Sequence, residues 1–153
     1  MMLSLYDELK GLTLALTASG IEYAVCGGLA MAIHTLPRAT VDMDLLVLTD
    51  DLDQVLQIAR ARGYTLSAKP MTFAQGQVEM HRVSKLDPDI GDVLILDLLM
   101  VTPELRPVWE DRQEILWEGE TLQVVSREGL IALKTLRLSG QDIDDIKRLR
   151  GNL

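Results

Sequence analysis

The sequence predicts an α/β fold, in which helices and strands alternate along a single domain covering residues 1–153. In some segments apolar residues recur at three- and four-residue steps, as on helices with one buried face. In others they form short continuous or alternating runs, as in strands. The composition agrees, because 153 residues with 48% hydrophobic and 25% charged side chains are typical of one globular core.

The first half of the chain alternates predicted helices and strands. They are a helix over residues 3–16, a strand over 23–26, a helix over 29–33, a strand over 40–48 and a helix from about 51 to 62. Gly20 and Gly63 stand where glycine commonly ends a helix, and Asp50 or Asp51 is expected to cap the helix that Gly63 ends. Gly27–Gly28 makes the turn between the first strand and the next helix.

The second half is predicted to hold further strands and two closing helices. The strands cover residues 64–68, 77–83, 92–100, 114–117 and 121–125, with a loop region around Pro70 and Gly76 and a hairpin turn at 118–120. Ser126 is expected to cap a helix over residues 127–138. Gly140 is expected to interrupt the helical region, and residues 142–150 form the last predicted helix.

Charge and cysteine content narrow the classes of partner. A net charge of −8 argues against general attraction to nucleic acid, because that attraction depends on Lys and Arg displacing counterions. The single Cys26 cannot form an internal disulfide, which favours a reducing cytoplasm. The apolar runs are far shorter than the ~20 residues of a membrane-spanning helix, and early charges at the N-terminus argue against a signal peptide.

Asp42 and Asp44 form a pair that could hold divalent metal. Residues two apart on a strand point to the same face and lie roughly 6.5 Å apart along it. Two carboxylates so placed repel each other unless water or a cation neutralises them, and Mg²⁺ prefers such hard oxygen ligands. The alternative is a solvated strand edge or a helix-capping loop.

Asp97 strengthens the metal hypothesis. It interrupts the apolar run over residues 93–100, where a carboxylate is costly to bury unless it is paired, protonated or bound to metal. If its strand lies beside the strand of Asp42 and Asp44, three carboxylates meet at one place, as two-metal phosphoryl-transfer sites require. The alternative is an aspartate at a strand end that reaches water or a backbone amide.

Gly27–Gly28 lies between a strand and a helix. Glycines there let the backbone approach a ligand closely, and the N–H groups of the helix start suit a phosphate. A tight turn with no ligand is the alternative for this pair.

Together these segments resemble the nucleotidyltransferase fold, and most closely the AbiEii-type toxins of abortive-infection systems. The first motif of that family resembles the stretch YAVCGGLAMAIHTLPRATVDMDLLV over residues 23–47. ILDLL at 95–99 resembles the strand with the third carboxylate, and EGLIALKTLR at 128–137 followed by DIDDI at 142–146 resembles the closing Lys and Asp helices. The resemblance implies a mixed β-sheet flanked by helices.

The resemblance also implies roles for the site residues. Asp42 and Asp44 would bind Mg²⁺ or Mn²⁺, and Asp97 would complete the metal site and help deprotonate the attacking hydroxyl. Gly27–Gly28 would cradle a nucleoside triphosphate, and Lys134 would steady its phosphates.

Other polar residues have open alternatives. Arg38 either contacts a phosphate or pairs with Asp42 or Asp44 without contacting the ligand itself. Lys134 is either a phosphate ligand or a solvated charge. Asp142 and Asp145 share a helix face, where capping or pairing with a nearby cation is favoured over a place in the site.

His34, on an apolar helix, is expected to be a packed histidine rather than a base. His81 carries no functional signal in the sequence.

Three functions fit these observations. The first is a metal-dependent transferase that moves a nucleoside monophosphate from a triphosphate to a hydroxyl of RNA, tRNA, a protein or a small molecule, as a toxin with an antitoxin partner in the AbiEii case. The second is a module of the same fold that binds nucleotide or a partner without chemistry. The third is a nucleotidyltransferase of the antibiotic-modifying kind, which fits the short, acidic chain better than an RNA substrate does.

Overall fold

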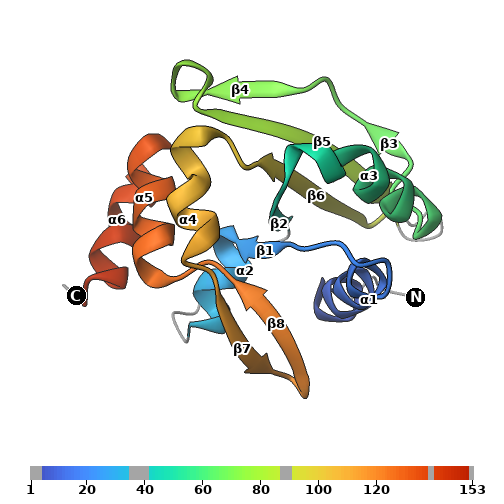
Figure 1. Cartoon of the computed structure of the whole chain (residues 1–153), viewed down its shortest axis with the longest axis horizontal. Helices are drawn as coiled ribbons and strands as arrows, with labels where there is room; N and C mark the ends of the chain where they lie inside the picture. The colour runs from blue at the N-terminus through green and yellow to red at the C-terminus, as the bar shows by residue number, and fades with distance from the viewer. Residues whose placement is uncertain (1–4, 35–41, 87–90, 138–139, 152–153) are drawn as a thin grey trace.

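The computed structural model describes residues 5–34, 42–86, 91–137 and 140–151 (Figure 1). Its helices are α1 (Leu5–Ala18), α2 (Gly27–Ile33), α3 (Leu52–Ala61), α4 (Arg106–Glu110), α5 (Arg127–Arg137) and α6 (Gly140–Leu149). Its strands are β1 (Ala24–Cys26), β2 (Asp42–Val47), β3 (Leu66–Ser67), β4 (Met71–Phe73), β5 (Val78–Leu86), β6 (Val93–Met100), β7 (Gln113–Trp117) and β8 (Glu120–Val124). Short 3₁₀ turns are η1 (Thr49–Asp51), η2 (Ala74–Gly76) and η3 (Pro103–Leu105).

The described strands form one mixed sheet in the order β3-β5-β6-β2-β1-β8-β7, with β4 also paired to β5. The pairs β2–β6 and β1–β8 are parallel, and the remaining pairs are antiparallel. In Figure 1, α1 and α3 lie at one side of the strands and α4, α5 and α6 at the other. The predicted α/β fold, a mixed β-sheet flanked by helices, is confirmed.

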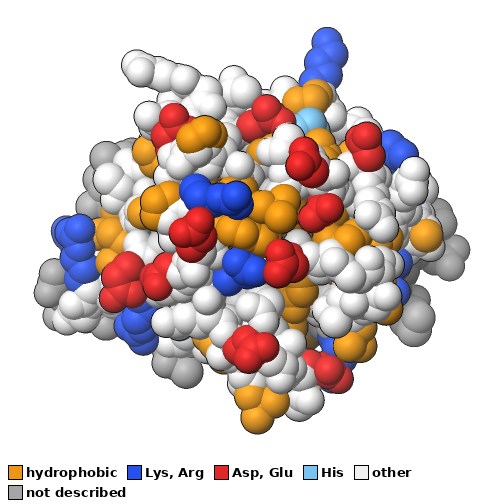
Figure 2. All heavy atoms as spheres, in the orientation of Figure 1, with side chains coloured by type: hydrophobic (Ala, Val, Ile, Leu, Met, Phe, Trp, Pro, Cys, Tyr) orange, Lys and Arg blue, Asp and Glu red, His pale blue; other side chains and the backbone are white. Residues whose placement is uncertain are grey.

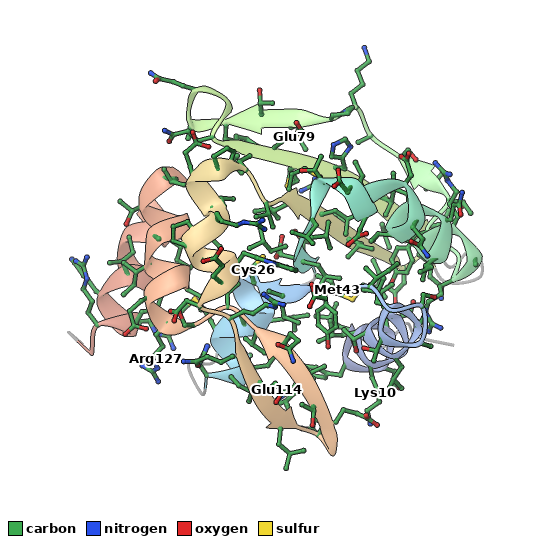
Figure 3. All side chains as sticks on the ribbon, in the orientation of Figure 1. Lys10, Cys26, Met43, Glu79, Glu114 and Arg127 are labelled. Atoms are coloured by element: carbon green, nitrogen blue, oxygen red, sulfur yellow. The ribbon has the colours of Figure 1, made fainter. Side chains whose placement is uncertain are left out.

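The two central strands bury one face almost completely. On β2, Met43, Leu45 and Val47 have no exposed surface, and the alternate positions of β6 from Leu94 to Met100 are also buried. Helix α1 packs against β2 and contributes buried leucines to the same core. Figure 3 shows Met43 near the centre of the molecule, with Cys26 at the end of β1 close by. The polar residues of β2 and β6 therefore fall on the opposite face.

Several predicted boundaries are confirmed by backbone geometry. The Ser126 hydroxyl accepts a hydrogen bond from Gly129 N–H at 3.0 Å, so it caps α5 as expected. Gly63 has a φ of +99°, and Tyr64 N–H donates to Ala59 O, as at a glycine-terminated helix. Glu118 and Gly119, both with positive φ, join β7 and β8 in the predicted hairpin.

Other predictions need correction. Asp51 holds the cap position of α3 but makes no side-chain capping bond, because the turn η1 runs directly into the helix. Helix α6 begins at Gly140, which was expected to interrupt the helical region. Strand β5 continues to Leu86, beyond the predicted end at 83, because its pairing with β6 extends that far.

The sequence did not indicate β4 or α4. Strand β4 lies in the region expected to be a loop and gains its structure by pairing with β5. The short α4 starts with a proline in its first turn, where a missing N–H costs little. None of the described helices is both long and apolar enough to span a bilayer.

Candidate nucleotide and metal site

Strand register brings polar side chains of β2, β5 and β6 together on one face of the sheet. The three carboxylates among them, Asp42, Asp44 and Asp97, form the aspartate row, or carboxylate row. Asp44 on β2 is the parallel partner of Asp97 on β6. Asp97 is in turn the antiparallel partner of Arg82 on β5, and Asp44 faces Cys26 on β1. Directly paired residues project to the same face of a sheet, and Asp42 shares that face with Asp44 because it lies two residues away. The adjacent strands expected for the three aspartates are confirmed.

This row forms the floor of a cavity of about 280 Å³. The wall opposite the strands is helix α5. The lining residues are Cys26, Gly27, Gly28, Asp42, Asp44, Phe73, Val78, Met80, Arg82, Asp97, Leu99, Leu130, Leu133, Lys134 and Leu136. Carboxylates and cations therefore share the cavity with apolar side chains from β4, β5, β6 and α5. A few polar groups converging among apolar ones are typical of small-molecule sites.

Asp97 is buried, with 3% of its surface exposed, and Arg82 neutralises it. Arg82 Nε donates to Asp97 Oδ1 at 2.7 Å and Nη2 donates to Oδ2 at 3.0 Å, so the guanidinium grips both carboxylate oxygens. These hydrogen bonds raise the pKa of Arg82 above its usual value, and the charges of Asp97, Asp42 and Asp44 raise it further against the effect of desolvation. The cation that the buried Asp97 requires is thus supplied by the chain itself.

The sequence analysis missed Arg82. One signal was present: Arg82 lies two and four residues after Met80 and Val78 on a predicted strand, so it had to project from the same face of a sheet as these apolar residues. Which face, and opposite which carboxylate, depends on the pairing of β5 with β6 across a connection whose register the sequence does not reveal.

Two of the three site carboxylates are placed to bind a divalent cation. Asp42 and Asp44 offer hard oxygen ligands on one strand face, which suits Mg²⁺ or Mn²⁺. Both oxygens of Asp97 are bonded to Arg82. Within the described ranges, no three or more His, Cys, Asp or Glu side chains are grouped as a metal site. The residues therefore fit a cation through Asp42 and Asp44, with Asp97 held by Arg82.

Gly27 is fitted closely to Asp44. It has a φ of +66°, which side chains other than glycine rarely adopt, and a Cβ at this position would overlap the Asp44 carboxylate. The glycine turn therefore lets the backbone at the start of α2 lie directly against a site carboxylate. Gly28 follows and also lines the cavity.

Lys134 is not a solvated charge. Its Nζ lies 2.9 Å from Asp145 Oδ2 on α6, and the two side chains are 5% and 0% exposed. The predicted pairing of Asp145 with a nearby cation is confirmed. Since Lys134 also lines the cavity, this pair joins α5 and α6 at the edge of the site.

Comparison with known proteins gives the fold its name. No protein-family model and no curated sequence matches the chain. Among solved structures, a candidate nucleotidyltransferase from Thermotoga maritima superposes with a TM-score of 0.67 at 13% identity, covering 95% of this chain and 90% of its own. The chain has the nucleotidyltransferase fold. The lincosamide adenylyltransferase LnuA, bound to lincomycin, has a TM-score of 0.61 at 16% identity and 99% coverage of both chains.

A third neighbour with this fold was solved with a bound ligand. It is ANT(2")-Ia in complex with adenylyl-2"-tobramycin, with a TM-score of 0.66 at 14% identity, covering 94% of this chain and 85% of that one. At these identities, it is the superpositions that show the nucleotidyltransferase fold.

The remaining polar candidates lie outside the cavity or outside the described structure. His34 Nε2 donates to Val125 O at 2.8 Å, and Arg127 donates to His34 O at 3.1 Å, so this histidine ties the end of α2 to the start of α5. Its expected structural role agrees with these contacts. His81 pairs with Glu79 at 2.9 Å. Arg38 and the side chain of Asp142 lie outside the described residues.

Proposed function

We propose that this chain transfers a nucleoside monophosphate from a nucleoside triphosphate to a hydroxyl acceptor. The observation that carries the proposal is one cavity, in a nucleotidyltransferase fold, lined by Gly27, Gly28, three aspartates and Lys134. In this reaction the acceptor oxygen bonds to the α-phosphorus, the bond from that phosphorus to the β-phosphate oxygen breaks, and pyrophosphate leaves with the acceptor proton passing to a base. Positioning and charge neutralisation supply most of such catalysis.

Five of the lining residues have a stated part in this proposal. Asp42 and Asp44 hold Mg²⁺ or Mn²⁺, which when bound supplies positive charge to the phosphates. Gly27 and Gly28 give the triphosphate close access to backbone, and Lys134, which lines the same cavity, steadies the phosphates. A phosphate contact by Arg38 remains a prediction of the sequence.

A small-molecule hydroxyl is the favoured acceptor. The cavity is small and partly apolar, with Phe73, Met80 and Leu99 beside the carboxylates. The net charge is −8, and the described side chains in Figure 2 show acidic and basic groups interspersed with no continuous basic surface on that face. RNA or tRNA needs such a surface. The neighbours LnuA and ANT(2")-Ia, whose structures hold lincomycin and adenylyl-tobramycin, support this choice.

The AbiEii-type resemblance supports a different acceptor. In this alternative the chain is a toxin that modifies RNA, tRNA or a protein in the cytoplasm, and an antitoxin restrains it. The ordered motifs from Tyr23 to the closing helices are the observation behind it, and a neighbouring antitoxin gene would favour it.

One observation favours the alternative of a module that binds nucleotide without chemistry. Asp97 is already neutralised by Arg82, so the third carboxylate is engaged within the protein. A module that only binds nucleotide could keep the Arg82–Asp97 pair intact while the nucleotide is bound. A transferase that uses Asp97 as a metal ligand or base would have to loosen this pair in each catalytic cycle.

Incubation of the protein with each labelled triphosphate, Mg²⁺ and either total RNA or a small-molecule extract tests the proposal. Label transferred to the small-molecule fraction supports the favoured acceptor, and label on RNA or protein supports the toxin. Binding of triphosphate with metal but no transfer to any fraction would leave the binding module.

A thermal-shift experiment tests the metal ligands separately. Mg²⁺ or Mn²⁺ plus triphosphate should raise the melting temperature, because a ligand that binds only the folded state stabilises it. Asp42→Asn/Asp44→Asn should abolish this gain. Asp50→Asn/Asp53→Asn is the matched control, since it removes the same charge from two exposed positions outside the cavity. An equal gain in both double variants would place the nucleotide elsewhere.

A further inference from the structure

The contact between Arg82 and Asp97 occupies the carboxylate that a metal site would use. The two hydrogen bonds, at 2.7 Å and 3.0 Å, engage one oxygen each. A cation ligated by Asp97 would have to share or take an oxygen that already accepts from the guanidinium. The guanidinium and a metal ion bound to the same carboxylate would also lie close together, and two positive charges repel each other strongly in a partly buried site. Arg82 and a bound cation therefore weaken each other's interaction with Asp97.

Arg82 also lies within the electrostatic influence of the two other site aspartates. The charges of Asp42 and Asp44, as well as that of Asp97, favour the protonated guanidinium. Arg82 thus pairs with Asp97 and adds positive charge near Asp42 and Asp44, the carboxylates that would attract a divalent cation. Lys134, the other cation lining the described cavity, is paired with Asp145 at 2.9 Å. Among the described residues, Arg82 supplies counter-charge to Asp97 through a direct ion pair.

The exposure of the two partners differs in a way that permits exchange. Asp97 has a side chain only 4% exposed, whereas that of Arg82 is 34% exposed. Asp97 is held on the central strand β6 with little exposed surface, whereas the long Arg82 side chain has open space beside it in the cavity. The guanidinium can leave while the carboxylate stays in place.

We propose that Arg82 and a divalent cation compete for Asp97, so that Arg82 stabilises the carboxylate row before metal binds and sets the affinity for the metal. The proposal rests on the proposed function, because it takes Asp42 and Asp44 as the ligands to which Asp97 is added. Arg82 is a positioning residue here: it acts on the site through Asp97. The two hydrogen bonds of its planar fork explain why Arg rather than Lys suits this position.

The test is direct titration of Mn²⁺ into the metal-free full chain by calorimetry, without nucleotide. Arg82→Met should bind Mn²⁺ roughly tenfold more tightly than the wild type, because a competing cation has been removed. Arg82→Lys should lie between them, since an ammonium cannot grip both oxygens. Arg106→Met is the matched control: it removes one positive charge from an exposed arginine on α4 that does not line the cavity, and should leave Mn²⁺ affinity unchanged.

A double-variant cycle separates competition from simple repulsion. In an Asp97→Asn background, Arg82→Met should tighten Mn²⁺ binding much less, because the contested carboxylate is gone. An equal gain in both backgrounds would show that Arg82 only repels the metal through space, and would overturn the proposal. Unchanged or weaker binding in Arg82→Met would overturn it as well.

A second readout protects the test against a poorly folded variant. Without metal, Arg82→Met should melt at a lower temperature than the wild type, and Mn²⁺ should recover most of the difference, because Asp97 regains a cation. If Arg82→Met does not fold, Arg82→Lys carries the same test in the same direction. Mn²⁺ binding to the wild type without tightening in either variant sinks the competition alone. No Mn²⁺ binding by any variant sinks the metal role in the proposed function too.

Discussion

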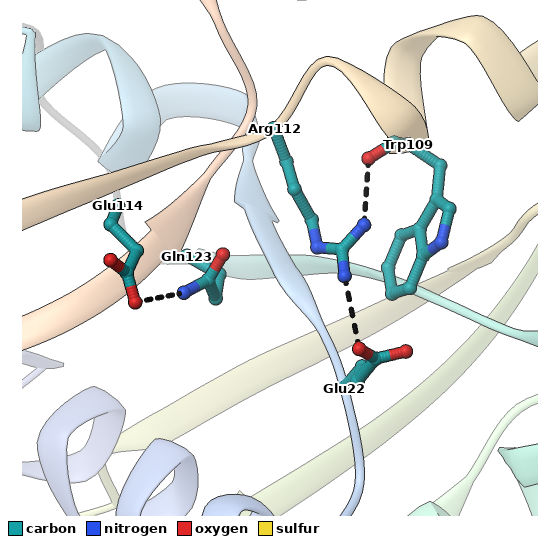
Figure 4. A network of polar contacts seen from close by, with 5 residues as sticks. All are labelled: Glu22, Trp109, Arg112, Glu114 and Gln123. Atoms are coloured by element: carbon teal, nitrogen blue, oxygen red, sulfur yellow. Dashed lines mark hydrogen bonds and ion pairs between the residues drawn. The ribbon is translucent and has the colours of Figure 1, made fainter.

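Arg82 beside the cavity and Arg112 beside α4 both contact a carboxylate, yet the two regions use their arginine differently. Asp97 is 4% exposed and meets Arg82 through two hydrogen bonds, whereas Glu22 is 62% exposed and meets Arg112 through one, at 3.3 Å. Figure 4 shows Arg112 between Glu22 and Trp109. Arg112 also donates to Trp109 O at 2.9 Å, and its guanidinium lies 4.0 Å from the Trp109 ring centre.

The difference shows that the exposure of the acid decides what the arginine does. Near Arg112, water solvates Glu22 whether or not the arginine is present, so the value of Arg112 lies in stacking on Trp109 and in binding its backbone. Near Arg82, the acid is almost completely buried and depends on its partner. The first arrangement fastens α4 to the chain before β1. The second leaves a charge whose partner can be exchanged, as a binding site requires.

The largest effect is expected on the cavity side, at Lys134. Lys134→Met leaves the completely buried Asp145 without its cation, and should lower the free energy of unfolding by about 3–5 kcal/mol. Urea unfolding measures the change. Lys134→Met/Asp145→Leu removes both charges and should recover most of the stability. A loss below about 1 kcal/mol in the single variant would mean that this pair resembles the exposed one at Glu22.

A smaller effect is expected at Gly27, where the glycine turn contacts the Asp44 carboxylate. Gly27→Ala adds a Cβ that overlaps the Asp44 carboxylate and forces alanine to a φ of +66°, which together should cost about 2–4 kcal/mol. Thermal unfolding without metal measures this. Gly27→Ala/Asp44→Ala should recover the part due to overlap, while the backbone strain remains. No recovery would show that the turn, not the carboxylate, is the constraint.

The smallest effects are expected in the Arg112 region. Arg112→Met should cost about 1–2 kcal/mol, because it loses the contact with the Trp109 ring and a hydrogen bond to its carbonyl. Glu22→Gln should cost less than about 0.5 kcal/mol, since the acid is exposed. Paired urea titrations compare them. A Glu22→Gln loss as large as that of Arg112→Met would erase the contrast between the two regions.

Local rules and the family resemblance together predicted the three aspartates of the site. Period-two geometry places Asp42 and Asp44 on one face, and the cost of burying Asp97 requires a partner nearby. The sequence could not predict that partner. Arg82 is 15 positions from Asp97, and on an isolated strand it looks like any solvated arginine.

The same limit explains the other differences in the fold. Strand β4 and the extension of β5 to Leu86 depend on pairing between strands, which no local pattern encodes. The position of Lys134 was ambiguous for the related reason that its burial depends on where α6 docks. The resemblance to nucleotidyltransferases gave the correct fold because it carried this long-range information in the order of its motifs.

The alignment of Asp44 with Asp97 also bears on how the chain reaches its native state. A shift of one residue between β2 and β6 would turn the aspartates of the shifted strand towards the core that Met43, Leu45 and Leu98 occupy. Burying an unpaired carboxylate there is far more costly than losing an apolar contact. The charges of the site thus penalise misaligned strand pairings during folding, and variants that replace them with apolar residues are expected to populate such misfolded pairings even if their native state becomes more stable.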